Sequence, residues 1–137
     1  MTEAPPIAHL EYREDLNILF LRWLRAANTE EFMEGYSGAM EAGHPDKVHC
    51  WLYDTRRRGP ATPEAEAWFF ESYLPMVHAS LNKPHHIAVL HTPDHFIHIR
   101  DVIGFDKFHA HNEGTLLTME FFDSEQKAVK WLMQCKG

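Results

Sequence analysis

The sequence is poor in cysteine and contains no long apolar run. Cys50 and Cys135 are the two cysteines in 137 residues, so we expect reduced thiols and no disulfide framework. No segment reaches the roughly 18 consecutive apolar residues of a membrane span, and residues 1–6 lack the basic and then apolar pattern of a secretion signal. These absences predict a cytoplasmic protein without a membrane span.

Basic residues are in the minority, and several catalytic motifs are missing. Lysine and arginine total 13 against 20 aspartates and glutamates, which gives a net charge of −7. Such a charge repels phosphate backbones, so we expect no nucleic-acid partner. There is no glycine-rich phosphate loop and no G-x-S-x-G motif, which argues against nucleotide turnover and serine hydrolysis. No catalytic residue and no cofactor are therefore predicted.

Hydrophobic patterns divide the chain into alternating strands and helices. A chain of this length fits one domain, residues 1–137, and can bury about two thirds of its unfolded surface. Apolar runs predict strands at residues 7–12, 16–23, 48–54, 87–90 and 116–122, of which the first two form a hairpin. Helical spacing and capping residues predict helices at residues 28–43, from 62 past 76, at 92–104 and at 125–136.

The resulting order, ββαβαβαβα, defines the expected fold class. Strands that alternate with helices require right-handed crossovers, so we predict an α/β domain in which helices cover a mainly parallel five-stranded sheet. The N-terminal hairpin adds its first strand. Pro75 removes a backbone donor inside the second expected helix, which predicts a kink or break near Leu74.

The segment 48–60 is the most informative part of the chain. An apolar strand ends at Asp54 and is followed by Thr55, three arginines and a Gly-Pro breaker. Sites in open α/β sheets lie at the carboxyl ends of strands. We therefore expect these residues to bind an anionic ligand ahead of the next helix, with Asp54 orienting one guanidinium through a two-point pair. The alternative is a solvated charge run that contributes little. The predicted ligand-binding residues are Asp54, Thr55, Arg56, Arg57 and Arg58.

The chain also contains 11 histidines. His91, His95 and His98 are weak candidates for a metal site, but their spacing matches no established zinc pattern, so no metal ligand is predicted. Because histidine side chains ordinarily change charge near neutral pH, a chain with this many histidines is expected to have several such changes there. A different hypothesis is a small hydrolase or isomerase in which His91 acts as the base and Asp54 orients it.

Aromatic residues recur at helical and strand positions. Residues with this spacing usually fill a core. They could instead line a pocket for an apolar ligand or form a dimer contact, and the sequence leaves these alternatives open. The set comprises Trp51, Trp68, Phe69, Phe70, Tyr73, Phe96 and Phe108.

Three segments carry a family resemblance. Residues 51–54 (WLYD), 87–90 (IAVL) and 121–132 (FFDSEQKAVKWL), together with the order of elements, resemble the small STAS-like domains called SpoIIAA-like. The likeness extends from about residue 16 to 132. It implies a STAS-like fold and a non-enzymatic role: contact with a regulatory protein partner, or binding of a small anionic or apolar ligand. Both a monomer and a homodimer are compatible with it.

The resemblance also implies a position for a regulatory switch. In the related anti-sigma-factor antagonists, the matching strand ends in Asp-Ser-Ser-Gly, and the second serine is phosphorylated to control partner binding. Residues 54–57 (DTRR) occupy that position here. Arg56 stands where the phosphoserine would be, and Thr55 is the remaining hydroxyl.

Overall fold

The structure is a computed structural model that describes residues 6–43 and 47–135. Two sequence predictions fall largely outside these ranges. One is the absence of a secretion signal in residues 1–6, of which residues 1–5 are not described, and the other is the end of the last helix at Lys136. The strands are β1 (Ala8–Arg13), β2 (Ile18–Trp23), β3 (Cys50–Asp54), β4 (His85–Leu90) and β5 (Leu117–Phe122). The helices are α1 (Thr29–Gly43), α2 (Pro63–Trp68), α3 (Leu74–Ser80), α4 (Pro93–His98), α5 (Phe105–Asn112) and α6 (Glu125–Gln134), with π-helical segments η1 (Phe69–Tyr73) and η2 (Ile99–Ile103).

The strands form one five-stranded sheet in the order β1-β2-β3-β4-β5. β1 and β2 pair antiparallel as the expected hairpin, and the other three pairs are parallel. β3 therefore lies at the centre of the sheet, where all five of its residues are buried. The prediction of a mainly parallel sheet opened by a hairpin is confirmed.

The helical connections are more divided than the sequence predicted. Three helical segments, α2, η1 and α3, join β3 to β4, and another three, α4, η2 and α5, join β4 to β5. Gly104, at a φ of 90°, separates η2 from α5. A positive φ is accessible to glycine without the steric cost that other residues meet. The single helix expected at residues 92–104 therefore continues, after a turn, into a helix that the sequence did not predict.

Pro75 changes the hydrogen-bond pattern of its helix. The backbone N–H of Leu74 donates to the Phe69 carbonyl, five residues earlier, and α3 begins at Leu74. Proline has no N–H to continue the usual ladder, and a wider π turn accommodates the gap. The chain does not break near Leu74, because the backbone there remains helical and forms a π turn, and the predicted kink stays a prediction.

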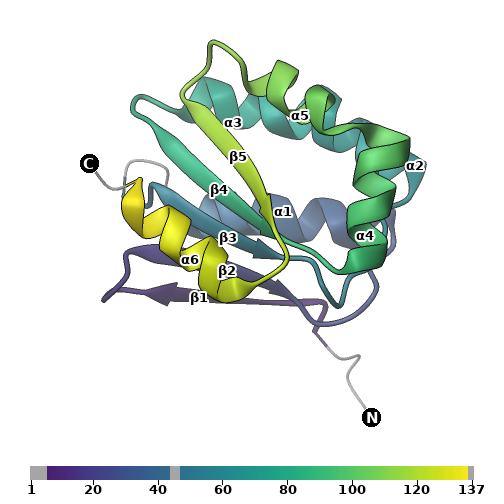
Figure 1. Cartoon of the computed structure of the whole chain (residues 1–137), viewed down its shortest axis with the longest axis horizontal. Coiled ribbons are helices and arrows are strands. Elements are labelled where there is room, and N and C mark those ends of the chain that lie inside the picture. The colour runs from purple at the N-terminus through teal and green to yellow at the C-terminus, as the bar shows by residue number, and fades with distance from the viewer. Residues whose placement is uncertain (1–5, 44–46, 136–137) are drawn as a thin grey trace.

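Helices cover both faces of the sheet. α6 packs on one face, where its Ala128 and Leu132 join buried residues of the central strands (Figure 1). The other helices lie on the opposite face and enclose the larger core. Because successive strand side chains point to opposite faces, Leu52 of β3 faces α6 while Tyr53 faces the larger core. The carboxyl end of β3 thus emerges between two helical layers.

Candidate functional site

The loop after β3 sends its three arginines into different environments. Nε and Nη2 of Arg56 each lie 2.9 Å from a carboxylate oxygen of Asp54, and its backbone N–H donates to the same carboxylate at 3.2 Å. This is the two-point pair expected from the sequence. Arg22 of β2 also donates to Asp54, at 3.1 Å. Burial alone would raise the pKa of Asp54, but these donors outweigh it and hold the pKa below its usual value.

Arg57 and Arg58 differ in burial and in partners. Arg57 is exposed and, within residues 6–43 and 47–135, has no hydrogen-bond or ion-pair partner. Arg58 is only 7% exposed. Its guanidinium donates to the Tyr36 hydroxyl and to the Gly59 carbonyl oxygen at 3.1 Å, and its Nη2 lies 3.4 Å from Nε2 of His95. Arg58 is therefore an interior cation, whereas Arg57 is a surface one.

Aromatic rings surround the Arg58 cation. Its central guanidinium carbon lies 4.9 Å from the ring centre of Phe32 and 5.8 Å from those of Trp23 and Tyr36. Rings in these positions attract a desolvated cation by roughly 2 kcal/mol. No carboxylate in the described part of the chain forms an ion pair with Arg58. The guanidinium is thus in direct contact with aromatic rings and not with a carboxylate.

Arg58 also keeps unused donors. A guanidinium has five N–H groups, and the contacts with Tyr36, Gly59 and His95 account for one each. About two N–H groups therefore have no acceptor among the residues that the structure describes. Buried donors are rarely left unpaired, because each one costs about 1–3 kcal/mol. Each nitrogen of Arg58 has one partner, so the remaining donors, on Nη1 and Nη2, are available to a further acceptor.

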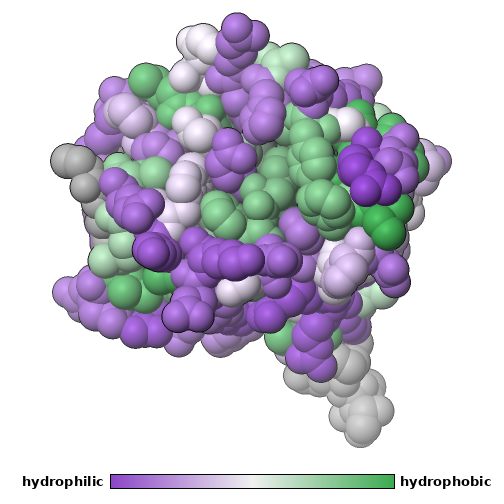
Figure 2. All heavy atoms as spheres, in the orientation of Figure 1, coloured by the Kyte–Doolittle hydropathy of each residue, from purple (hydrophilic) through white to green (hydrophobic). Residues whose placement is uncertain are grey.

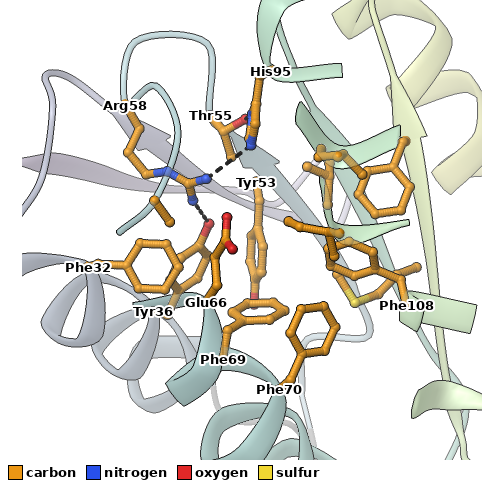
Figure 3. Close-up of a pocket in the computed structure, with 16 residues that line it drawn as sticks. Phe32, Tyr36, Tyr53, Thr55, Arg58, Glu66, Phe69, Phe70, His95 and Phe108 are labelled. Carbon is orange, nitrogen blue, oxygen red and sulfur yellow. Dashed lines mark hydrogen bonds between the residues drawn. The ribbon is translucent and has the colours of Figure 1, made fainter. Parts of the chain in front are cut away.

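A partly open cavity of about 50 Å³ lies beside Arg58 on the larger-core side of the sheet. Arg58, Thr55, His95 and Glu66 form its polar end, and Figure 3 shows the first three linked around the end of the loop. Aromatic and aliphatic side chains form the remaining wall. They include Phe69, Phe70, Val89, Ile99, Phe108 and Met119. The cavity therefore presents a charged end and an apolar end.

His95 of α4 is held in one neutral form. The Thr55 hydroxyl donates to the Leu90 carbonyl oxygen at 2.8 Å, so it can only accept from Nδ1 of His95, which lies 3.0 Å away. The proton is thereby assigned to Nδ1, and Nε2 presents a lone pair to Arg58. Burial, followed by the neighbouring charge of Arg58, lowers the pKa of His95 to about 3.

Thr55 and Arg56 have structural partners at the position of the regulatory serine. Thr55 is 1% exposed, and its hydroxyl contacts both Leu90 and His95. The Arg56 side chain lies against Asp54. A protein kinase could not reach the Thr55 hydroxyl in this conformation, so this position joins the loop to α4 instead of presenting a hydroxyl.

Glu66 brings an acidic group to the cavity. Its Oε1 lies 2.6 Å from Nε2 of His98, which links α2 to α4. Among the described residues its Oε2 has no hydrogen-bond donor. Glu66 also lines the cavity that Arg58 lines, and Figure 3 shows its carboxylate at the same end as the guanidinium.

Half-buried apolar residues surround the outer part of the cavity. Ile103 and Phe121 line it and are both partly exposed. The ring of Phe105 lies 5.2 Å from that of Phe121 and 5.3 Å from that of Phe96. Figure 2 shows apolar residues gathered on the viewed face where α4, α5 and β5 meet. The apolar end of the cavity therefore continues toward an apolar part of the surface.

The other predicted site residues lie elsewhere. Asp54, Arg56 and Arg57 do not line the cavity, and their role in binding a ligand stays a prediction. Nδ1 of His91 lies 3.2 Å from the Thr92 carbonyl oxygen, and no hydrogen bond joins His91 to Asp54 in the structure's described ranges. Within those ranges, no group of three or more histidine, cysteine, aspartate or glutamate side chains could hold a metal ion.

The sequence did not identify every residue of the cavity. Tyr36 and Glu66 lie in the helices expected at residues 28–43 and from 62 past 76, and neither was a predicted site residue. The spacing of residues within one helix can indicate that a side chain is buried, but it does not indicate which distant loop that side chain contacts. Of the aromatic set, Phe69, Phe70 and Phe108 line the cavity, while Trp51 is buried under α1.

Comparison with known proteins bears on the fold. No family model matches the chain, and no curated protein matches it. One similar solved structure is an uncharacterised protein of the DUF3478 family from Shewanella loihica PV-4, described as having a SpoIIAA-like fold. It matches with a TM-score of 0.56 and 17% sequence identity over 91% of each chain. The chain has a SpoIIAA-like fold.

This match confirms the expected resemblance at the level of the fold. The five-stranded, mostly parallel sheet with its single antiparallel pair is the SpoIIAA-like sheet in this chain. A match at this sequence identity supports a shared architecture but does not indicate a shared ligand. The function of the site therefore depends on its own residues. The structure's described helices include none that is both long and apolar enough to cross a membrane.

Proposed function

We propose that this SpoIIAA-like protein is a non-enzymatic binding module for a small organic anion, a carboxylate with a short apolar part. Arg58 carries the proposal. It is a buried cation that has no ion pair among the described residues, and about two of its N–H groups are free. A carboxylate accepts two parallel N–H bonds from a guanidinium, and this pairing is among the strongest hydrogen-bond arrangements in proteins.

The size and lining of the cavity support a small ligand. A volume of about 50 Å³ has room for roughly three to five water-sized groups. Because the cavity is partly open, short-chain carboxylic acids with a few more atoms than this fit with their ends toward the opening. Their methyl groups would contact Phe69, Phe70 and Phe108, which line the apolar end. Each buried methylene contributes about 0.8 kcal/mol to binding.

The arrangement of the histidines favours binding over catalysis. The hydrolase hypothesis requires a carboxylate that orients His91, but Asp54 pairs with Arg22 and Arg56. The histidine that faces the cavity, His95, has its Nε2 directed at a cation and a pKa of about 3. A base of that strength removes protons poorly near neutral pH. We therefore expect the ligand to be released chemically unchanged.

The test is an NMR titration of the protein with 3-methylbutanoate and with its uncharged amide. We expect saturable shifts at the cavity residues with the acid and none with the amide. Arg58→Gln is expected to weaken binding of the acid at least about tenfold. Arg57→Gln, on the neighbouring exposed residue, should leave it unchanged.

Three results would contradict the proposal. The amide could bind as well as the acid, the acid could bind Arg58→Gln as well as the wild type, or Arg57→Gln alone could abolish binding. The last result would favour the exposed surface of the loop over the cavity. A backbone NMR spectrum of each variant establishes that it has folded, and recovery of unchanged acid tests the absence of turnover.

A further inference from the structure

We infer that the ligand is a small α-amino acid with an apolar side chain, bound as a zwitterion between Arg58 and Glu66. This inference rests on the proposed function, because the carboxylate of the amino acid occupies the place given there to the organic anion. It adds a second recognition group, a cationic ammonium on the adjacent carbon.

Glu66 supplies the second half of the site. Its carboxylate lines the same cavity as Arg58, and only Oε1 is occupied, by His98 at 2.6 Å. An ionised carboxylate accepts up to about four hydrogen bonds. Oε2 has no donor within residues 6–43 and 47–135. The cavity therefore has unused donors on a cation and an unused acceptor on an anion at one end.

The two charges select a zwitterion. A simple carboxylate bound to Arg58 would place its negative charge near Glu66, and like charges in a partly buried site repel. A simple amine would meet the reverse penalty at Arg58. An α-amino acid carries both charges on neighbouring carbons, so each one faces its complement. Figure 3 shows Arg58 and Glu66 on the same side of the cavity, with Phe69, Phe70 and Phe108 beyond them.

The remaining lining limits the side chain of the amino acid. The wall opposite the charges consists of aromatic and aliphatic groups, including Val89, Ile99 and Met119. A polar side chain would lose its hydration there without a partner. The cavity of about 50 Å³ also favours few atoms. Alanine and valine therefore fit the site better than charged or large amino acids.

His95 and Thr55 support Arg58 without taking its place. Because Nε2 of His95 accepts from Nη2 at 3.4 Å, the imidazole fixes one edge of the guanidinium. Tyr36 fixes Nη1 from the α1 side. A guanidinium held on several sides binds a carboxylate at less entropic cost than a free one. These residues are positioning residues, whereas Arg58 and Glu66 contact the ligand.

The test compares amino acids with their des-amino counterparts by isothermal titration calorimetry on the full chain. The pairs are L-valine with 3-methylbutanoate, and L-alanine with propionate. We expect each amino acid to bind the wild type at least about tenfold more tightly than its counterpart. L-valinamide, which lacks the carboxylate, should not bind measurably.

Variants assign the preference to Glu66. In Glu66→Gln we expect the ratio of valine to 3-methylbutanoate affinity to fall to about one, because the ammonium loses its counter-charge. Glu64→Gln, at an exposed position of the same helix, should keep the ratio. The comparison within the wild type does not depend on how Glu66→Gln folds.

The outcomes separate this inference from the proposed function. If 3-methylbutanoate binds through Arg58 and valine binds no more tightly, the zwitterion is wrong and the anion-binding function stands. A ratio unchanged in Glu66→Gln would also overturn the inference. If neither member of a pair binds, both are wrong.

Discussion

Nη2 of Arg58 lies 3.4 Å from Nε2 of His95, the nitrogen that carries no proton. The contact is favourable only while the imidazole is neutral, because a protonated ring would place two cations together. The Thr55 hydroxyl fixes the tautomer by accepting from Nδ1 at 3.0 Å, while burial and the charge of Arg58 keep the ring neutral. Thr55 thus determines which nitrogen of His95 carries the proton, and Arg58, from the same loop, contacts the other nitrogen.

The first prediction concerns the tautomer of His95. We expect its ring to remain neutral, with the proton on Nδ1, throughout pH 5–8, because its pKa is about 3. Nitrogen-15 NMR of the imidazoles measures this directly. Thr55→Val removes the acceptor for Nδ1 and should shift the Nδ1 resonance, while Arg58 keeps Nε2 unprotonated. A His95 signal that titrates near pH 6.5 would contradict the assignment.

The second prediction concerns stability in mild acid. The pKa of His95 is about 3 in the folded chain and about 6.5 in the unfolded one. Between these values the unfolded state binds the extra proton, so stability falls as pH falls through that window. At pH 5 the loss from this residue approaches about 2 kcal/mol relative to pH 7.5.

His95→Asn, which retains a donor toward Thr55, tests this pH dependence. We expect urea unfolding of the variant to lose less stability between pH 7.5 and 5 than the wild type does. Burial also lowers the pKa of His86 and His91. Their contributions have the same sign and cancel in the comparison. Equal losses in the two proteins would mean that His95 titrates normally.

The third prediction concerns the carboxylate at the end of β3. Asp54→Asn removes a charge that pairs with Arg56 at 2.9 Å and with Arg22 at 3.1 Å. We expect a loss of about 1–3 kcal/mol in urea unfolding at pH 7. Because the folded pKa of Asp54 lies below 3.8, its contribution is present above that pH and is lost as pH falls through the folded value.

Asp15→Asn is the matched control for Asp54. Asp15 also forms a two-point pair with an arginine, Arg13, but both side chains are exposed. Exposed pairs contribute little. The unfolding midpoint of the control should therefore not change. If both variants lost stability equally, burial would not be the reason for the Asp54 effect.

The fourth prediction tests the packing of α1 against the sheet. A Cβ at Gly35 would overlap the indole ring of Trp23, whereas one at Gly38 meets no atom within 4 Å. Gly35→Ala should lose about 1–3 kcal/mol through overpacking. Gly38→Ala on the same helix should gain roughly 0.5–1 kcal/mol from helix propensity. Thermal unfolding of the two variants gives opposite shifts if α1 is seated as described.

The fold could be predicted further than the site. Asn28 and Glu31 form a reciprocal cap at 2.8 and 3.0 Å, and Thr62 caps α2, at the two helix starts that capping residues predict. Such signals are local, so the sequence carries them directly. α5 was missed because Gly104 indicated a helix end, whereas here the chain resumes a helix directly after it.

The site depends on contacts that the sequence does not contain. The sequence identified the loop of Thr55 and Arg58, but it could not distinguish Arg58 from Arg57. The difference arises because the side chain of Arg58 enters a space lined by Phe32 and Tyr36 of α1. Glu66 reaches the same space from α2. Which neighbouring arginine turns inward is a property of tertiary packing.

Nitrogen-15 NMR of the arginine side chains during a titration with L-valine examines Arg58 itself. Arg58→Gln assigns the Arg58 signals. If the buried guanidinium captures the carboxylate, its Nη–H signals will shift saturably, while those of the exposed Arg57 stay in place. An Arg58 signal that remains constant while valine binds, or a shift confined to Arg56 and Arg57, would show that the cavity is not the binding site.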